Sequence, residues 1–116
     1  MLGASSVFIT PATATTHPLL IGTSGRRDAY VIRLALPNGQ KVKTIPAGTY
    51  TFAIHDYSRI HNFALGSQTA NKRLFTTGIK WIGTTTYTLR LAPGHYAYAC
   101  SAHFATMNGT FVVARR

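Results

Sequence analysis

The segment from Cys100 to Met107 places three potential metal ligands within a short stretch of chain. Cys100 is the only cysteine of the sequence, His103 follows three residues later, and Met107 lies four residues beyond that. A thiolate, an imidazole and a thioether are soft to borderline donors. Trigonal copper sites that exchange single electrons combine a thiolate, two imidazoles and a weak axial thioether. Such a site needs a second histidine, and His61, from a separate upstream segment, is the candidate.

Each of these residues also has an ordinary explanation. Cys100 ends an alternating segment with Tyr96 and Tyr98, so it could be a small buried apolar side chain. Zinc would prefer a closed set of cysteine and histidine ligands, for which the thioether of Met107 is a poor substitute. A catalytic thiol would need a base, an orienting group and an oxyanion hole; His103 could be the base, but no acidic residue lies nearby in the sequence. The combination of donors, rather than any one of them, favours copper.

Composition limits the other possibilities. The chain has 116 residues, 46% of them apolar, which is enough for one domain with one core. No apolar run is long enough for a membrane helix, so we expect no transmembrane segment. Twelve Lys and Arg face two acidic residues, giving a net charge of +10 that favours acidic partners. Nucleic acid is the competing interpretation, but no helical, zinc-finger or aromatic-interleaved basic motif supports it, so we expect no nucleic-acid binding.

The hydrophobic pattern predicts an all-β domain. Alternation of large side chains, as in Tyr87–Leu91 and Tyr96–Cys100, is typical of strands with one buried face. About eight short strands separated by Gly and Pro predict an antiparallel Greek-key β-sandwich or barrel. The strands are expected at 19–21, 29–36, 50–54, 61–65, 79–82, 85–91, 95–100 and 109–114. We expect this domain to span residues 18–116.

The first seventeen residues differ in composition from the rest. They are rich in Ser, Thr, Ala and Pro, which predicts a flexible tail or linker, although Val7–Ile9 could add a short edge strand. Met1 to Thr16 contain neither a basic leader nor a continuous apolar stretch, so we do not expect an intact secretory signal there.

The sequence resembles the cupredoxins, the small blue-copper proteins related to plastocyanin and azurin, and in particular bacterial single-domain plastocyanin-like proteins. The resemblance covers roughly residues 19–114, and its most specific part is His61-Asn62-Phe63 followed about forty residues later by Cys100-x-x-His103-x-x-x-Met107. The other matching positions are Ala47-Gly48-Thr49-Tyr50-Thr51-Phe52, Asp56, Ser58, Pro93-Gly94, Tyr96, Tyr98 and Gly109.

This resemblance implies a mononuclear copper site. His61, Cys100 and His103 would form the trigonal plane, and Met107 would be the axial ligand. The side chain of Asn62 would hydrogen-bond to Ser101, in the layer around the ligands that orients them and tunes the metal. The residues flanking Cys100, Ala99 and Ser101, are not the histidines that oxidases with a trinuclear copper cluster carry there, so we expect no enzymatic activity.

The resemblance also implies a function. The protein would carry single electrons between redox partners through the Cu(II)/Cu(I) couple, from an extracytoplasmic location that is periplasmic, cell-surface or secreted. Its electron-transfer patch would comprise His103, Phe104, Ala105 and Pro93, and its partners would present acidic docking surfaces to a monomer. The alternatives are a copper carrier or scavenger that uses the same ligands, and a metal-free sandwich with accidental ligands.

Overall fold

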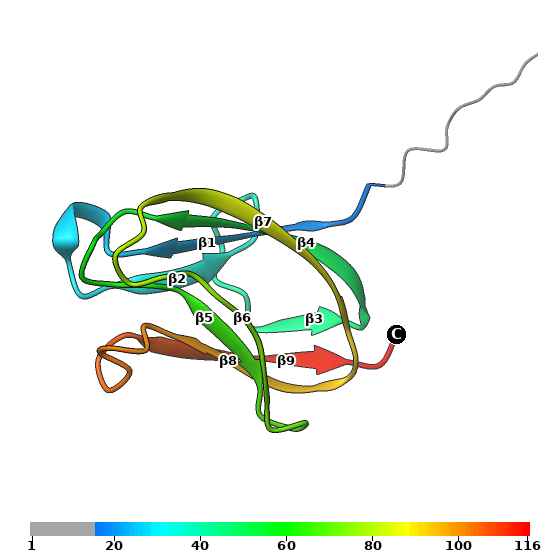
Figure 1. Cartoon of the computed structure of the whole chain (residues 1–116). Helices are drawn as coiled ribbons and strands as arrows, with labels where there is room; N and C mark the ends of the chain where they lie inside the picture. The colour runs from blue at the N-terminus through cyan, green and yellow to red at the C-terminus, as the bar shows by residue number, and fades with distance from the viewer. Residues whose placement is uncertain (1–15) are drawn as a thin grey trace, which may run out of the picture.

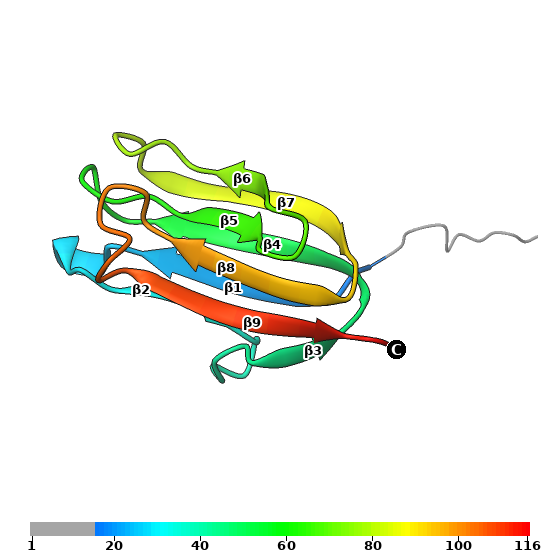
Figure 2. The same cartoon turned by 90° about the horizontal axis from the view of Figure 1, so that it is seen from below.

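Two stacked β-sheets form the body of the molecule in the computed structural model, which describes residues 16–116 (Figures 1 and 2). The predicted tail therefore lies almost wholly outside the described residues, as does the suggested strand at Val7–Ile9. Thr16 and His17 precede the first strand without secondary structure. No helix among the described residues is long and apolar enough to cross a membrane.

The first sheet has four strands in the order β2-β1-β4-β7, and the second has five in the order β3-β9-β8-β5-β6. A short 3-10 helix, η1, lies between β1 and β2 at Arg26–Asp28. The strands of the first sheet are β1 (Leu19–Ser24), β2 (Ile32–Ala35), β4 (Gly48–Asp56) and β7 (Gly83–Leu91). Those of the second are β3 (Thr44–Pro46), β5 (Ala64–Ser67), β6 (Lys72–Thr76), β8 (Gly94–Ala99) and β9 (Asn108–Ala114).

The predicted all-β sandwich is confirmed, with three corrections. The sheets are mixed rather than antiparallel, because β1 pairs in parallel with β4 and β3 with β9. The described residues form nine strands, since β3 and β6 were not foreseen. The strand predicted at 79–82 is wrong: these residues form an exposed turn, and their apolar side chains face solvent instead of a sheet.

Alternating side chains of both sheets meet in one core. Phe52 and Ile54 of β4 are fully buried. Phe63 stacks on both Phe75 and Tyr98, and Phe52 meets Phe75 edge to face. The inward positions of β8 are those that the period of two predicts, and they end at Cys100. Burial of this aromatic core is the main favourable contribution to folding, and it holds the strand ends in fixed positions.

Four loops converge at one end of the sandwich. They are residues 25–31, 57–63, 77–82 and 100–107, and they follow β1, β4, β6 and β8. Figure 1 shows these connections together on the left, whereas the β7–β8 turn lies at the opposite end. Among the described residues, every large hydrophobic side chain that is exposed, except Leu19, belongs to one of these loops: Tyr30, Val31, Tyr57, Ile60, Ile79, Trp81, Ile82 and Phe104.

Gly109 gives a test of the packing between β8 and β9. It lies directly opposite Tyr98, and a Cβ atom at this position would overlap the buried tyrosine ring, 2.7 Å from Cε2. Tyr98 cannot move away, because it stacks on Phe63. We expect Gly109→Ala to lower the free energy of unfolding by about 2–3 kcal/mol, the usual cost of overpacking a core, as measured by urea unfolding. Thr110→Ala, at the exposed neighbouring position, should cost less than about 1 kcal/mol, and equal losses in the two variants would contradict this explanation.

Candidate metal centre

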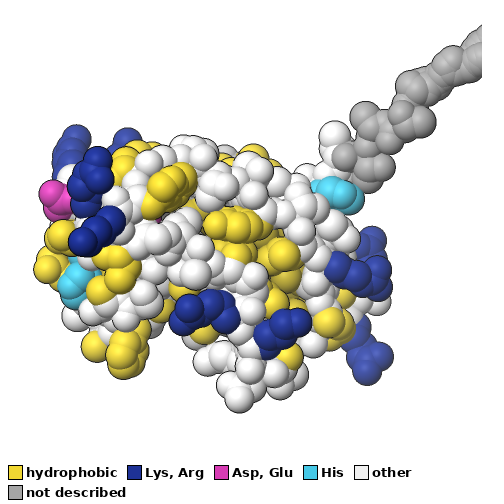
Figure 3. Space-filling model, in the orientation of Figure 1, with side chains coloured by type: hydrophobic (Ala, Val, Ile, Leu, Met, Phe, Trp, Pro, Cys, Tyr) yellow, Lys and Arg dark blue, Asp and Glu magenta, His cyan; other side chains and the backbone are white. Residues whose placement is uncertain are grey.

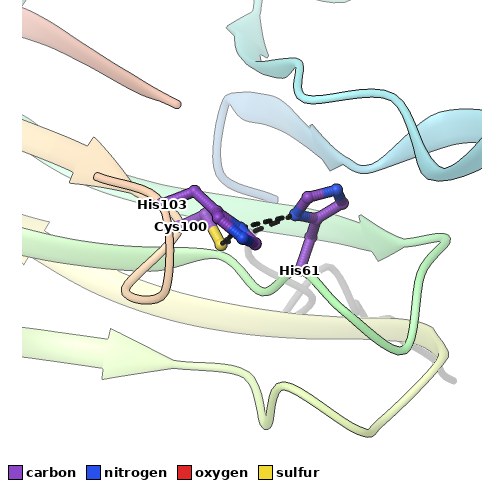
Figure 4. Close-up of side chains that lie close together, drawn as sticks. All are labelled: His61, Cys100 and His103. Carbon is purple, nitrogen blue, oxygen red and sulfur yellow. Dashed lines mark hydrogen bonds between the residues drawn. The ribbon is translucent and has the colours of Figure 1, made fainter. Parts of the chain in front are cut away.

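His61, Cys100 and His103 bring three ligand atoms together at the loop end of the sandwich (Figure 4). The Nδ1 atoms of the two histidines are 3.1 Å apart, and the Cys100 Sγ lies 3.6 Å from Nδ1 of His103 and 3.9 Å from Nδ1 of His61. Cys100 and His61 are fully buried, and His103 is partly exposed. Residues 16–116 contain one such group of three or more His, Cys, Asp or Glu side chains.

The size of this triangle fits a metal ion. The point equidistant from three atoms with these separations lies about 2.1 Å from each of them, close to metal–nitrogen and metal–thiolate bond lengths in protein sites. One thiolate and two imidazoles in a trigonal arrangement are the donor set of electron-transfer copper sites. The residues present therefore fit such an ion without rearrangement.

Hydrogen bonding presents the correct nitrogen of His61. Its Nε2 lies 3.2 Å from the carbonyl oxygen of Asp28, which can only accept, so Nε2 carries the proton. In the neutral ring Nδ1 then keeps its lone pair and points at Cys100 and His103. A hydrogen bond of this kind from the outer ring nitrogen fixes both the tautomer and the orientation of a ligating histidine.

The side chain of Asn62 ties the two ligand-bearing loops together. Its Oδ1 accepts from the backbone N–H of Ser101 at 2.8 Å, and its Nδ2 donates to the Ser101 hydroxyl at 3.0 Å and to the Thr77 carbonyl at 3.0 Å. The hydrogen bond that the resemblance implies between Asn62 and Ser101 is thus present. Because Asn62 follows His61 and Ser101 follows Cys100, these bonds hold His61 and Cys100 next to each other.

Asp56 organises the loop that leads to His61. Its carboxylate accepts from the Ser58 N–H at 3.1 Å and from the Thr77 hydroxyl at 3.1 Å, and the same hydroxyl accepts from the Phe63 N–H at 2.9 Å. Burial raises the pKa of Asp56, whereas the hydrogen bonds from Ser58 and Thr77 and the nearby His61 act in the opposite direction. Every buried polar side-chain atom among the described residues has a partner, so the loop is locked.

Met107 closes the loop that begins at Cys100. It is fully buried, its carbonyl accepts from the Cys100 N–H at 3.0 Å, and its own N–H donates to the His103 carbonyl at 2.8 Å. The backbone of Met107 is therefore hydrogen-bonded to the backbones of both Cys100 and His103.

The structure separates the predicted electron-transfer patch into two places. His103, Phe104 and Ala105 are neighbours on the 100–107 loop, and Phe104 is 69% exposed. Pro93 is a correction: it lies in the β7–β8 turn at the far end of β8, beside Gly48 and Arg116. The error arose because β8 carries the chain through the full length of the sheet between Pro93 and the ligand loop.

Two contributors to the site were not foreseen from the sequence. The carbonyl of Asp28 orients His61, and the ring of Tyr30 lies against both histidines, with centroids 4.7 Å from each. A backbone carbonyl carries no residue-specific signal. Tyr30 falls within the strand predicted at 29–36. A tyrosine in a strand is common, so its position gave no sign of a role in the site.

Solved structures support the fold. No protein-family model and no curated protein sequence matches the chain. A structure of the copper protein rusticyanin is similar, with a TM-score of 0.61 and 18% identity over 82% of this chain and 76% of that one. Rusticyanin from Thiobacillus ferrooxidans gives a TM-score of 0.59 at 16% identity, over 82% and 75% of the two chains. Auracyanin A, a "blue" copper protein from Chloroflexus aurantiacus, gives 0.57 at 18% identity, over 82% and 97%.

The chain therefore has the cupredoxin fold, as the resemblance in the sequence implied. The two segments of the motif, His61-Asn62-Phe63 and Cys100–Met107, meet in this fold at the end where the four loops converge.

Removal of the Asn62 side chain tests the link between the loops. Asn62→Ala leaves the Ser101 N–H without its partner and removes one of the two donors to the buried Thr77 carbonyl, which keeps its bond from the Thr76 hydroxyl. We therefore expect a loss of about 2 kcal/mol in the free energy of unfolding of the metal-free protein. Ser101→Ala removes only an exposed hydroxyl and keeps the backbone bond, so it should cost about 1 kcal/mol or less. Urea unfolding of both variants measures the difference, and similar losses would show that the link is not structural.

Asp56 predicts an unusual response to acid. Because its pKa is higher in the folded protein than the ordinary value of 3.8, the buried carboxylate destabilises the fold at neutral pH, and this penalty disappears as the pH falls through the raised pKa toward 3.8. Asp56→Asn cannot ionise and lacks this change. We expect the stability of the wild type relative to Asp56→Asn to rise on acidification from pH 7 to about pH 4, as measured by urea unfolding at each pH. A relative fall would mean that the hydrogen bonds to Asp56 outweigh its burial.

Proposed function

We propose that this protein is a mononuclear blue-copper electron carrier with His61, Cys100 and His103 as equatorial ligands and Met107 as the axial ligand. The observation that carries the proposal is the triangle of two Nδ1 atoms and one Sγ, whose centre is at bonding distance from all three. When bound, copper supplies the Cu(II)/Cu(I) couple. The similarity of the fold to rusticyanin and auracyanin A, which are described as copper proteins, supports the same conclusion.

The residues around the proposed ligands suit an electron carrier, because their hydrogen bonds and burial keep the ligands from moving. A ligand set that keeps one geometry in both oxidation states needs little rearrangement when an electron arrives or leaves. Asn62 fixes one loop to the other, Asp28 orients His61, and Cys100 is fully buried at the end of β8. Locked rotamers and supporting hydrogen bonds of this kind keep a functional site in its productive geometry. They also favour retention of the metal, which argues against a copper carrier that must release its cargo.

His103 provides the route to the surface. It is the only one of the three clustered ligands that is not fully buried, and it adjoins Phe104, the most exposed large hydrophobic side chain among the described residues. The loop end of the molecule combines apolar side chains with Arg and Lys (Figure 3). Arg26, Arg27, Arg59 and Lys80 are exposed on these loops. An apolar contact surface with a basic rim fits a redox partner with an acidic docking surface, since opposite charges speed encounter.

The proposal makes the protein a carrier rather than an enzyme. This part of the proposal rests on Ala99 and Ser101, which flank Cys100 where oxidases with a trinuclear copper cluster carry histidines. We further propose an extracytoplasmic location, which rests on the resemblance to the cupredoxins.

Addition of Cu(II) to the metal-free protein tests the function. We expect one equivalent to produce an intense visible absorption from the Cys100 thiolate, which ascorbate removes and an oxidant restores. Cys100→Ala should abolish the band, and Met107→Leu should retain it with altered intensity and a changed reduction potential, because the axial ligand tunes the site.

Absence of a visible band in the wild type would overturn the blue-copper proposal. Rapid loss of Cu(I) to a modest chelator, with the band otherwise normal, would instead favour the copper carrier or scavenger. His55→Ala serves as the matched control, because His55 bonds to Thr84 on the side of β4 away from the core and takes no part in the ligand cluster.

A further inference from the structure

Tyr30 lies over both histidines of the proposed copper site. Its ring centroid is 4.7 Å from that of His61 and 4.7 Å from that of His103, with interplanar angles of 76° and 69°. The two imidazoles meet each other at 4.8 Å and 68°. The three rings therefore form a closed cluster of edge-to-face contacts, the arrangement that aromatic quadrupoles favour. His61 is fully buried and Tyr30 is 54% exposed, so the tyrosine is the solvent-facing member of the cluster.

The loop that carries Tyr30 is fastened to the site. Gly25, Arg27 and Asp28 have φ angles of 70°, 56° and 60°, in the left-handed region that residues other than glycine seldom adopt. Such conformations persist where the surroundings enforce them, and they are frequent at ligand clamps. Here the enforcing contacts are those of Asp28, whose carboxylate accepts from the Ser58 hydroxyl at 2.7 Å and whose carbonyl lies 3.2 Å from His61 Nε2.

Gly25, at the start of the loop that carries Tyr30, packs tightly against the loop that carries His61. The Gly25 N–H donates to the Val31 carbonyl at 3.0 Å and closes the loop around Tyr30. A Cβ atom on Gly25 would come within 2.6 Å of Ser58 Cβ and 2.8 Å of His61 Cδ2, so the backbone here packs directly on the ligand loop. Tyr30 is therefore held in place against the histidines from both sides of its own loop.

From these contacts we infer that Tyr30 is a positioning residue of the metal centre, an inference that rests on the proposed copper function. Its ring fixes the orientation of the His61 and His103 imidazoles and excludes water from their solvent side. Exclusion of water disfavours the more highly charged Cu(II) state, so the tyrosine raises the reduction potential. The same contacts slow the loss of copper, because an imidazole that cannot rotate away returns to the metal.

The test compares three variants of the copper-loaded full chain. Tyr30→Leu removes the aromatic ring at an exposed position, where folding should be preserved, and Tyr30→Phe keeps the ring. Tyr57→Leu is the matched control, since Tyr57 is 42% exposed at the same end but contacts Arg26 and His55, which lie outside the ligand cluster. We expect Tyr30→Leu to lower the reduction potential, shift the visible band and release copper to a chelator about tenfold faster, in line with two lost aromatic pairs. Tyr30→Phe should rescue all three properties, and Tyr57→Leu should match the wild type.

A measurement without metal separates this inference from the proposed function. In the metal-free protein the ring current of Tyr30 should change the proton chemical shifts of the His61 and His103 rings. Tyr30→Leu should abolish this change, whereas Tyr30→Phe should preserve it. Wild-type potential, spectrum and copper release in Tyr30→Leu would overturn the inference while leaving the copper function intact. A wild type that binds no copper would overturn the proposed function, and the NMR shifts would still decide whether Tyr30 positions the two imidazoles.

Discussion

The hydrogen bonds of Asn62 are the interaction on which the loop end of this molecule depends. His61 and Cys100 are 39 residues apart, and each lies just outside a strand, where the ladder of the sheet no longer fixes the backbone. Asn62 replaces that ladder with a side chain that accepts from Ser101 N–H and donates to its hydroxyl and to Thr77. Two loops that would otherwise move independently thereby act as one rigid unit.

A site built in this way requires several polar side chains to be buried in the interior. Asp56, Ser58, His61, Asn62 and Thr77 are all buried, and an unpaired buried polar group would cost about 1–3 kcal/mol. The network gives each of these side chains a hydrogen-bond partner, which removes that cost. These hydrogen bonds hold His61, Cys100 and His103 beside one another.

The few acidic residues of the protein lie at the loop end, near His61. The sequence contains two acidic residues, Asp28 and Asp56, and both are engaged around His61: Asp56 with Ser58 and Thr77, and Asp28 with Ser58. Asp56 is buried, whereas Asp28 is exposed on the same loop as Arg26 and Arg27, so one exposed acidic side chain faces the Lys and Arg of the described surface and the excess of positive charge extends to the loop end. There it surrounds exposed apolar side chains. One end of the sandwich therefore combines the cluster of His61, Cys100 and His103 with exposed apolar and basic side chains.

The sequence by itself determined the strand class and the donor atoms, because both are local properties: a period of two in Tyr96–Cys100, and the residue types of Cys100, His103 and Met107. The need for a second histidine pointed to His61, and the resemblance supported that choice and added the link from Asn62 to Ser101. Tertiary structure alone decided that β1 runs parallel to β4, that Pro93 lies at the far end of β8, and that Asp28 and Tyr30 meet the histidines. These features depend on contacts between residues far apart in the chain, and one of them uses a backbone carbonyl, which every residue possesses.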